Sequence, residues 1–458
     1  MKPLIASSLA NDPDISKAME SILKTVQKYQ QEITQIRSAN PERTLSYEAA
    51  LQKLGELRGG KTYFPFLGSG IGNGALVELM DGSIKYDFIS GIGVHYFGHN
   101  HPDIVAACLQ AAISDTVMEG NLQQNIDTVE LCNTLVEASG LPHCFLCSSG
   151  AMANENALKI AFQHHQPANR ILAFTHCFAG RTWSLAQITD KALYREGLPT
   201  NVFVDYVPFY NSDSPEESTA TAVKVMKEHL ARHPKEHAIM FFELVQGEGG
   251  CYPGNTDFFR SLMTLCRENN IAVFADEVQT FGRLPQLFAY QYFGLQDLID
   301  IVSIGKLSQV CATLFTDKYL PKAGLLSQTI TSSTSAIRSC QVIVQQLLQG
   351  GYFGDNGKIA QIGTYFSRKL QEISKRHPSL IEGPYGLGAM VAFTPFEGNP
   401  ERVGRFVQNL FQVGVIGFTA GSNPMRVRFL VPAGAVSLHD IDVVCDIIEK
   451  VLVTTANA

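Results

Sequence analysis

The sequence lacks an apolar run approaching the ~20 residues that a membrane-spanning helix needs, and it lacks an excess of basic residues. Lys and Arg number 36 against 43 Asp and Glu, which gives a net charge of −7. No Lys/Arg cluster is interleaved with aromatics, so nucleic-acid binding is not expected. The first residues, MKPLIASSLANDPDIS, contain too short an apolar stretch to predict a secretory signal. We therefore expect a cytoplasmic protein without a membrane or nucleic-acid partner.

Paired cysteine motifs are also missing. The ten cysteines are scattered, mostly in apolar segments, and only Cys144 and Cys147 have a C-x-x-C spacing. Without a second pair, the cysteines are interpreted as small buried hydrophobic residues in a reducing compartment, not as metal ligands or disulfide partners.

Three histidines crowd the segment HYFGHNHP, at positions 95, 99 and 101. Their spacing places all three on neither one helix face nor one strand face, and Gly98 and Pro102 indicate a loop. A structural role is favoured over metal binding.

The chain of 458 residues is too long for one hydrophobic core of ordinary size, so a large and a small domain are expected. Residues from about 14 to 58 read as helical and polar. The segment from about 340 to 458 carries long helical patterns and short apolar runs, which is typical of a smaller α+β domain.

A glycine-rich stretch, GSGIGNGALVELMDGSIKYDF, begins at Gly68. A dinucleotide-binding reading of its G-x-G pattern needs a strand before the glycines and a helix after them. Instead, two short apolar runs flank the turn pair Asp81-Gly82, which predicts a β-hairpin preceded by a loop.

From about 100 to 330, short continuous apolar runs alternate with helical segments. The runs are CFLC, RILAF, NVFVDY, AIMFFEL, IAVFA and DIVSIG. Continuous apolar runs suit strands covered on both faces, and strand–helix repetition predicts a largely parallel sheet. Ligands bind at the carboxyl ends of such strands, so the residue after each run is the place to expect chemistry.

Complementary polar groups follow several of these runs. Asp276 follows IAVFA, Lys306 follows IVSIG, and Glu243 follows AIMFF. Farther upstream, CFLC leads into Ser148-Ser149-Gly150 and then a series of good helix formers. The first-turn N–H groups of such a helix form an anion site that suits a phosphate.

Each of these residues alone has an ordinary structural explanation, because a lysine after a strand is usually solvated and an aspartate is usually a helix cap. Together they are the parts that pyridoxal 5'-phosphate (PLP) chemistry requires. The phosphate needs fixed donors, the ring nitrogen needs a carboxylate that keeps it protonated, and the aldehyde needs an amine.

From about Gly68 to the C-terminus, the chain resembles the class III, ornithine-type aminotransferases of PLP fold type I. The resemblance rests on motifs that occur in the family's order. They are DFISGIGVHYFGHNHP (87–102), SSGAMANENALK (148–159), HCFAGRT (176–182), ELVQGEGG (243–250), ADEVQTFGR (275–283), SIGK (303–306) and VRFLVP (427–432). It implies an α/β fold whose large domain has a mostly parallel seven-stranded sheet, with a smaller α+β domain. We expect residues 1–95 and 336–458 to form the small domain and 96–335 the large one.

For the cofactor, the resemblance implies that residues Ser149, Gly150 and Ala151 hold the phosphate. Phe178 and Val278 match the groups that pack on the two faces of the ring.

Asp276 matches the partner of the ring nitrogen, and Gln279 matches a contact to the phenolic oxygen. Lys306 matches the lysine that forms the Schiff base and later shuttles the proton. Asp276 and Lys306 are thus the predicted catalytic residues.

For the substrate, Arg428 matches the arginine that grips a carboxylate with its bidentate fork. A surface arginine on an edge strand is the alternative. Glu243, beside the cofactor, matches the acidic switch that covers this arginine when an ω-amino substrate is bound. Arg181 matches a further carboxylate contact.

Family members are homodimers with active sites at the subunit interface, so a homodimer is expected here. Thr329 is assigned as the residue that reaches the phosphate of the partner's cofactor, with Thr334 as a competitor.

The motif GKLSQVC (305–311) favours the L-lysine ε-aminotransferase branch, with a 2-oxo acid such as 2-oxoglutarate as acceptor. Acetylornithine, ornithine and 4-aminobutyrate remain alternative donors. A PLP decarboxylase or aminomutase on the same fold, and a paralogue that only binds, are alternative functions.

Overall fold

The computed structural model describes residues 3–115, 117, 118, 120 and 122–457, and the chain forms two compact units. Unit 1 contains Met1–Ser114, Gln361–Tyr385 and Ala389–Ala458, and unit 2 contains Asp115–Ala360 with Gly386–Gly388. The chain passes from unit 1 to unit 2 after residue 114 and returns to unit 1 after residue 360. The sequence had suggested boundaries after residues 95 and 335. Helix α5 (Pro102–Ala112) belongs to unit 1 because it packs against α2 (Pro13–Gln30). Helix α13 (Thr334–Gln349) belongs to unit 2 because it packs against α6 (Ile126–Ser139).

Unit 2 is built on a seven-stranded sheet with the order β5-β13-β12-β11-β8-β6-β7. Its strands are β5 (His143–Cys147), β6 (Arg170–Phe174), β7 (Phe203–Val207), β8 (His237–Phe242), β11 (Ala272–Asp276), β12 (Ile301–Ile304) and β13 (Cys311–Phe315). Neighbours pair in parallel except at β13, which is antiparallel to both β5 and β12. The predicted sheet, seven-stranded and mostly parallel, is confirmed.

Strand β13 was not predicted from the sequence. β12 ends at Ile304 and β13 begins at Cys311, and this short link has no room for the crossover helix that a parallel neighbour requires. The strand therefore runs in the opposite direction. Strands β8, β11, β12 and β13 are buried along their whole length, which explains their continuous apolar runs.

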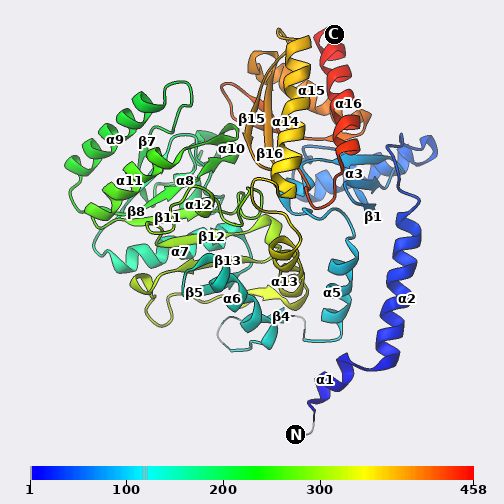
Figure 1. Ribbon diagram of the computed structural model, residues 1–458, viewed down its shortest axis with the longest axis horizontal. Coiled ribbons are helices and arrows are strands. Elements are labelled where there is room, and N and C mark those ends of the chain that lie inside the picture. Colours follow the sequence, from blue (N-terminus) through cyan, green and yellow to red (C-terminus); the bar gives the residue numbers. More distant parts are fainter. Residues whose placement is uncertain (1–2, 116, 119, 121, 458) are drawn as a thin grey trace. The chain divides into compact units, whose positions relative to one another are not determined.

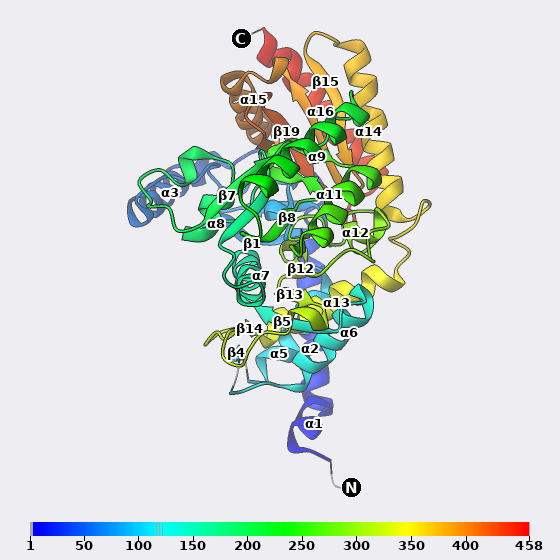
Figure 2. The same cartoon turned by 90° about the vertical axis from the view of Figure 1, so that its left-hand side faces the viewer.

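Helices surround this sheet (Figure 1). Besides α6 and α13 they are α7 (Gly150–His164), α8 (Trp183–Ile188), α9 (Pro215–Arg232), α10 (Gly247–Gly250), α11 (Thr256–Glu268) and α12 (Ala289–Tyr292), and short strands β4 (Val117–Met118), β9 (Val245–Gln246), β10 (Tyr252–Pro253) and β14 (Ser332–Ser333) complete the unit. Helix α7 packs across β5, β8, β11, β12 and β13, and Figure 2 shows it beside β12 and β13.

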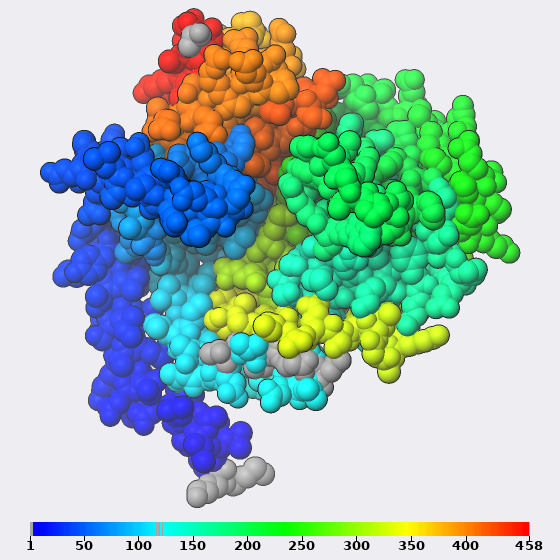
Figure 3. Space-filling view, turned by 180° about the vertical axis from the view of Figure 1, so that it is seen from behind, coloured from blue at the N-terminus to red at the C-terminus, as the bar shows by residue number. Residues whose placement is uncertain are grey.

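Unit 1 contains two four-stranded sheets, β1-β2-β3-β17 and β15-β16-β19-β18. Their strands are β1 (Gly68–Asn73), β2 (Leu76–Leu79), β3 (Ile84–Asp87), β15 (Ile381–Leu387, which ends in unit 2), β16 (Met390–Pro395), β17 (Val415–Ile416), β18 (Phe418–Ala420) and β19 (Arg426–Leu430). The other helices are α1 (Ile5–Ala10), α3 (Thr44–Arg58), α4 (Ser90–Gly93), α14 (Lys358–Arg376, which begins in unit 2), α15 (Pro400–Val413) and α16 (Leu438–Ala456). Figure 3 shows α1 and α2, in dark blue, at the surface; α1 has no buried residue.

The predicted hairpin is present. β2 and β3 pair antiparallel around Gly82, whose φ of +79° suits a glycine in a tight turn. The preceding glycine run was expected to be a loop, and this expectation is wrong: it forms β1, which pairs antiparallel with β2. Glycine has low strand propensity, but the ladder to β2 supplies the backbone partners that a loop would need from solvent.

The ten cysteines are free, and seven of them are buried. In the histidine-rich loop, His99 Nε2 lies 3.2 Å from Asp87 Oδ2. In the described part of the chain, no group of His, Cys, Asp and Glu is arranged to hold a metal ion. Nor does any described helix combine the length and the apolar character that crossing a membrane demands.

Candidate active site

The carboxyl ends of three neighbouring strands carry the polar residues singled out from the sequence. Asp276 is the last residue of β11 and pairs in register with Ser303 of β12. Lys306 follows β12, and Glu243 follows β8. Since β8, β11 and β12 are parallel and adjacent, the fold brings all three side chains to the same edge of the sheet.

These residues line one cavity of about 340 Å³, which lies wholly in unit 2. Its lining residues are Gly150, Ala151, Asn154, Phe178, Ala179, Gly180, Arg181, Glu243, Val245, Glu248, Asp276, Val278, Gln279, Thr280 and Lys306. The volume falls at the lower end of the range typical of small-molecule sites. Every residue that the sequence analysis assigned to the cofactor or substrate is among them, except Ser149, Thr329 and Arg428.

The backbone is tightly packed where the strands meet the cavity. A Cβ placed on Gly150 would lie 2.7 Å from Val278 Cγ1, and one on Gly305 would lie 3.0 Å from Cys311 Sγ. Both positions therefore admit only glycine without a shift of their neighbours. Lys306 has a φ of +53°, a left-handed conformation that is uncommon for a residue with a side chain. Such strain persists where surrounding structure enforces it, often at functional sites.

Helix α7 begins at the cavity. Ser149 is its N-cap, and the Ser149 hydroxyl accepts a hydrogen bond from the Met152 N–H at 3.2 Å. The first-turn N–H groups have no partner within a helix, and with the helix dipole they favour an anion. Gly150 and Ala151 bring this first turn to the cavity, whereas the Ser149 side chain is exposed and outside the lining.

Both oxygens of the Asp276 carboxylate accept hydrogen bonds. Oδ1 accepts from the Val278 N–H at 3.0 Å and from the Ser303 hydroxyl at 3.4 Å, and Oδ2 accepts from Asn154 Nδ2 at 2.7 Å. Burial raises the pKa of Asp276, while these hydrogen bonds and the charge of Lys306 oppose the rise. The carboxylate is therefore fixed in orientation and shielded from water.

Glu243 is the second buried acid. Burial, and then the nearby charge of Asp276, raise the pKa of Glu243 to about 8, against hydrogen bonding by the Phe178 N–H and the charge of Lys306. The Phe178 N–H donates to Glu243 Oε2 at 2.8 Å. With a pKa of about 8, Glu243 holds a proton at neutral pH.

A third acid, Glu277, lies behind the cavity and outside its lining. Its oxygens accept from Thr280 Oγ1 at 2.5 Å and from the Ala289 and Tyr290 N–H groups at 2.9 Å. Burial raises the pKa of Glu277 to about 7. This side chain ties the strand end to the first residues of α12.

Asn154 and Glu248 are among the lining residues that had received no role from the sequence. Asn154 stands four residues after Gly150, so it shares a face of α7 with it, and its side chain is 2% exposed. A polar residue with low helix propensity on the buried face of a helix was the available signal. Glu248 pairs with Lys191 at 3.3 Å, and nothing in its pattern separated it from a solvated acid.

The predicted substrate arginines occupy different units. Arg181 of unit 2 lines the cavity, and its guanidinium lies 3.7 Å from the centroid of the Tyr194 ring. Arg428 belongs to unit 1, on β19 between β16 and β18, and it is 1% exposed. Strand β19 is thus central in its sheet, and the alternative of a surface arginine on an edge strand is wrong.

The two threonines proposed to reach the phosphate of the partner's cofactor differ in burial and in hydrogen bonding. Thr334 is buried, and its hydroxyl donates to the Asp115 carbonyl at 2.5 Å, so it already has a partner within its own chain. Thr329 is exposed and lies outside the cavity lining.

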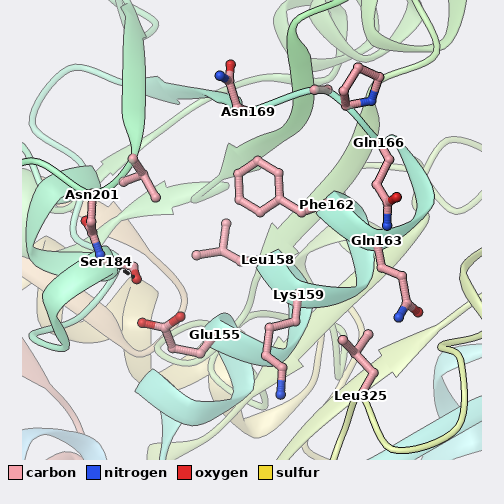
Figure 4. A pocket seen from close by; sticks show the side chains of 13 residues that line it. Glu155, Leu158, Lys159, Phe162, Gln163, Gln166, Asn169, Ser184, Asn201 and Leu325 are labelled. Atoms are coloured by element: carbon pink, nitrogen blue, oxygen red, sulfur yellow. Dashed lines mark hydrogen bonds between the residues drawn. The ribbon is translucent and has the colours of Figure 1, made fainter.

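A larger second cavity, of about 680 Å³, lies on the outer side of α7 (Figure 4). In the view, Phe162 and Leu158 occupy the middle, with Asn169, Gln163 and Glu155 around them. It contains one lysine, Lys159, and no buried carboxylate facing it. The smaller cavity, with its lysine, its fixed carboxylate and its helix N-terminus, is the candidate active site on chemical grounds.

The chain is similar to known proteins along most of its length. The family model described as aminotransferase class-III matches residues 69–452. An acetylornithine aminotransferase of Bacillus cereus is 30% identical over 397 residues, covering 84% of this chain and 94% of the relative. An acetylornithine aminotransferase of Methanocaldococcus jannaschii is 28% identical over 395 residues, covering 83% and 92%.

Among solved structures, a lysine aminotransferase from M. tuberculosis superposes with a TM-score of 0.75 at 23% sequence identity. The match covers 84% of this chain and 93% of that one. At this identity, the likeness supports a shared fold and no more.

Proposed function

The chain belongs to the class-III aminotransferase family, whose members depend on PLP, and we propose that it transfers the terminal amino group of an ω-amino donor to a 2-oxo acid such as 2-oxoglutarate. The observation that carries this proposal is the 340 Å³ cavity, in which Lys306, Asp276 and the first turn of α7 converge.

The residues present fit the cofactor. The glycine at position 150 lets Val278 pack directly against the start of α7, and this leaves the first-turn N–H groups open to a phosphate. Asp276 presents a buried acceptor for a protonated ring nitrogen, and Phe178 and Val278 supply packing surfaces. When bound, PLP supplies an aldehyde carbon that exchanges amines and a ring that withdraws electrons.

We assign the reaction chemistry to two residues. The Lys306 amine would hold the cofactor, and the same amine, once free, would serve as the base that takes and returns the substrate proton. The Asp276 carboxylate would keep the ring nitrogen protonated. Gln279 is assigned to the phenolic oxygen, and Ser149, Gly150 and Ala151 to the phosphate.

Substrate carboxylates are assigned to Arg181 and Arg428, as the family resemblance implies. An arginine charge beside Glu243 would favour its ionised form, which supports Glu243 as the acidic switch. Arg181 has a second supporting feature: its stacking on Tyr194 orients the guanidinium plane while leaving its N–H groups available.

The comparisons change the order in which the amino donors are proposed. The sequence motif favoured lysine, but the acetylornithine aminotransferases match over most of this chain at 28–30% identity, whereas the lysine enzyme matches in fold. We therefore put acetylornithine first and lysine second. We also propose a cytoplasmic location, supported by the ten free cysteines that a reducing compartment favours. A homodimer is proposed because the family resemblance implies it.

A donor screen tests the proposal. Purified protein with PLP and 2-oxoglutarate is offered acetylornithine, lysine, ornithine and 4-aminobutyrate, and glutamate is measured. Glutamate formed with at least one ω-amino donor is expected. Loss of donor carboxylate as carbon dioxide, or rearrangement without glutamate, would establish a decarboxylase or an aminomutase instead.

A further inference from the structure

The Asn154 side chain joins three parts of the candidate active site. Its Nδ2 group donates one hydrogen bond to Asp276 Oδ2 at 2.7 Å and another to the Ala179 carbonyl at 2.7 Å. The amide thus connects α7, the end of β11 and the loop that carries Phe178.

This geometry leaves the Asn154 amide little freedom. Both Nδ2 hydrogens are used, and the residue is 2% exposed on a helix that packs across the sheet. Its Oδ1 has no hydrogen-bond partner among the described residues, a cost for a buried acceptor. An apolar residue at this position would avoid that cost. The benefit of asparagine therefore lies in the hydrogen bonds of its Nδ2 group, one of whose acceptors is a carboxylate.

The two oxygens of Asp276 depend on different partners. On Oδ1, the Val278 N–H is backbone and remains after any side-chain change. On Oδ2, Asn154 is the hydrogen-bond partner that the structure shows. Removing Asn154 would leave this buried oxygen without that donor, and the desolvation penalty would then favour the protonated acid.

We propose that Asn154 is a positioning residue, whose amide fixes the Asp276 carboxylate and holds it ionised for the ring nitrogen of PLP. This inference rests on the proposed function, since it concerns the same cofactor. It also explains the choice of side chain. A leucine at position 154 would leave Asp276 Oδ2 without this hydrogen-bond donor, and an aspartate would place a second negative charge beside it.

The test compares Asn154→Ala and Asn154→Asp with Asn156→Ala. Asn156 is buried to the same 2% on the same helix, and its Nδ2 group has no hydrogen-bond partner among the described residues, so Asn156→Ala controls for the loss of a buried amide. PLP affinity of the cofactor-free full chain is measured by calorimetric titration at several pH values. Melting temperatures check folding, and Asn154→Gln, which displaces the amide by one methylene, serves if Asn154→Ala does not fold.

For Asn154→Ala we expect PLP affinity about 10- to 100-fold below that of Asn156→Ala, as for loss of a hydrogen bond to a charged group. Asn154→Asp should lose more. The deficit of Asn154→Ala relative to Asn156→Ala should shrink as pH rises, because a higher pH restores the ionised form of Asp276. The ionisation of Glu243, which lines the same cavity, is common to both variants and cancels in this comparison. In turnover, kcat should fall more than the donor KM changes.

Equal affinity in Asn154→Ala and Asn156→Ala, or a deficit that does not change with pH, would reduce Asn154 to a structural residue and overturn the proposal. Failure of the unsubstituted protein to bind PLP would overturn the proposed function as well. The two failures are therefore distinguishable.

Discussion

At the scale of single residues, the candidate active site consists of polar groups at strand ends that the fold shields from water. Lys306 and Asp276 could be predicted from the sequence, because each follows a buried apolar run and their types are complementary. Asn154 and Glu248 were missed because each has an ordinary reading in isolation. Their partners, Asp276 and Lys191, are far away in the sequence.

Replacing Lys306 with alanine should reduce turnover by at least about 10²–10⁴-fold, the range for loss of a positioned base, because the covalent hold on the cofactor is lost too. Borohydride reduction should fix the cofactor to the peptide containing residue 306 in the unsubstituted protein and leave the variant unlabelled, as read by mass spectrometry. Lys159→Ala, which removes the lysine of α7 that lines the second cavity, is the control and should retain both label and rate. Label on another lysine would refute the assignment.

Glu243 should make the folded protein sensitive to pH. Its pKa rises from an ordinary value of 4.5 to about 8 on folding, so between these values the folded chain holds a proton that the unfolded chain has released. Stability must then fall as pH rises through this window, by about 1.4 kcal/mol for each pKa unit at most. Glu243→Gln keeps an acceptor for the Phe178 N–H and cannot ionise.

The gain in unfolding free energy of Glu243→Gln over the unsubstituted protein, both free of cofactor, should therefore grow from pH 5 to 8 and then level off. Urea unfolding at each pH measures this difference. A gain that stays constant across the window would mean that Glu243 is ionised in the folded state.

At the scale of elements, the sequence predicted the large unit better than the small one. The runs RILAF and IVSI form β6 and β12 as expected, because burial on both faces imposes continuous apolar residues. Strand β13 escaped prediction because nothing in its composition reveals direction, and β1 escaped because its stabilisation comes from pairing and not from propensity.

Helix α4 contains a strained segment that no sequence pattern revealed. Ser90, Gly91 and Ile92 are consecutive residues with φ of +48°, +64° and +59°. For a β-branched residue this conformation is an outlier that costs about 1–2 kcal/mol. The Ile92 side chain is 40% exposed, so it recovers little of that cost by burial.

Ile92→Gly should therefore raise the unfolding free energy by up to about 1 kcal/mol, after the entropy cost of glycine is subtracted. Ile92→Val keeps the branched Cβ and should show no gain. Urea denaturation of the three proteins compares them, and a glycine variant less stable than the valine variant would show that side-chain contacts outweigh the strain.

At the scale of the whole molecule, the proposed homodimer makes a prediction about shared sites. If Thr329 serves the partner's cofactor, then a mixed dimer of Thr329→Ala and Lys306→Ala chains has one intact site, made of Lys306 from one chain and Thr329 from the other. Each variant alone has none.

Mixing the two inactive or weakly active variants under conditions of subunit exchange should restore up to about one quarter of the wild-type rate, since half of random dimers are mixed and each has one complete site. Activity after mixing, read against size-exclusion profiles, is the measurement. No recovery despite proven exchange would place Thr329 outside the partner's site. Thr334→Ala, whose hydroxyl is bonded within its own chain, should give no such recovery with Lys306→Ala.

The reversed direction of β13 has a consequence for this architecture. Phe315, its last residue, pairs with Ile301, the first residue of β12, so the chain leaves the sheet on the side away from Lys306. The polypeptide that continues from Phe315 therefore starts at the edge of the sheet opposite Lys306. One strand that runs antiparallel to its neighbour β12 thus takes the chain to the edge of the sheet opposite the one at which Lys306 lies.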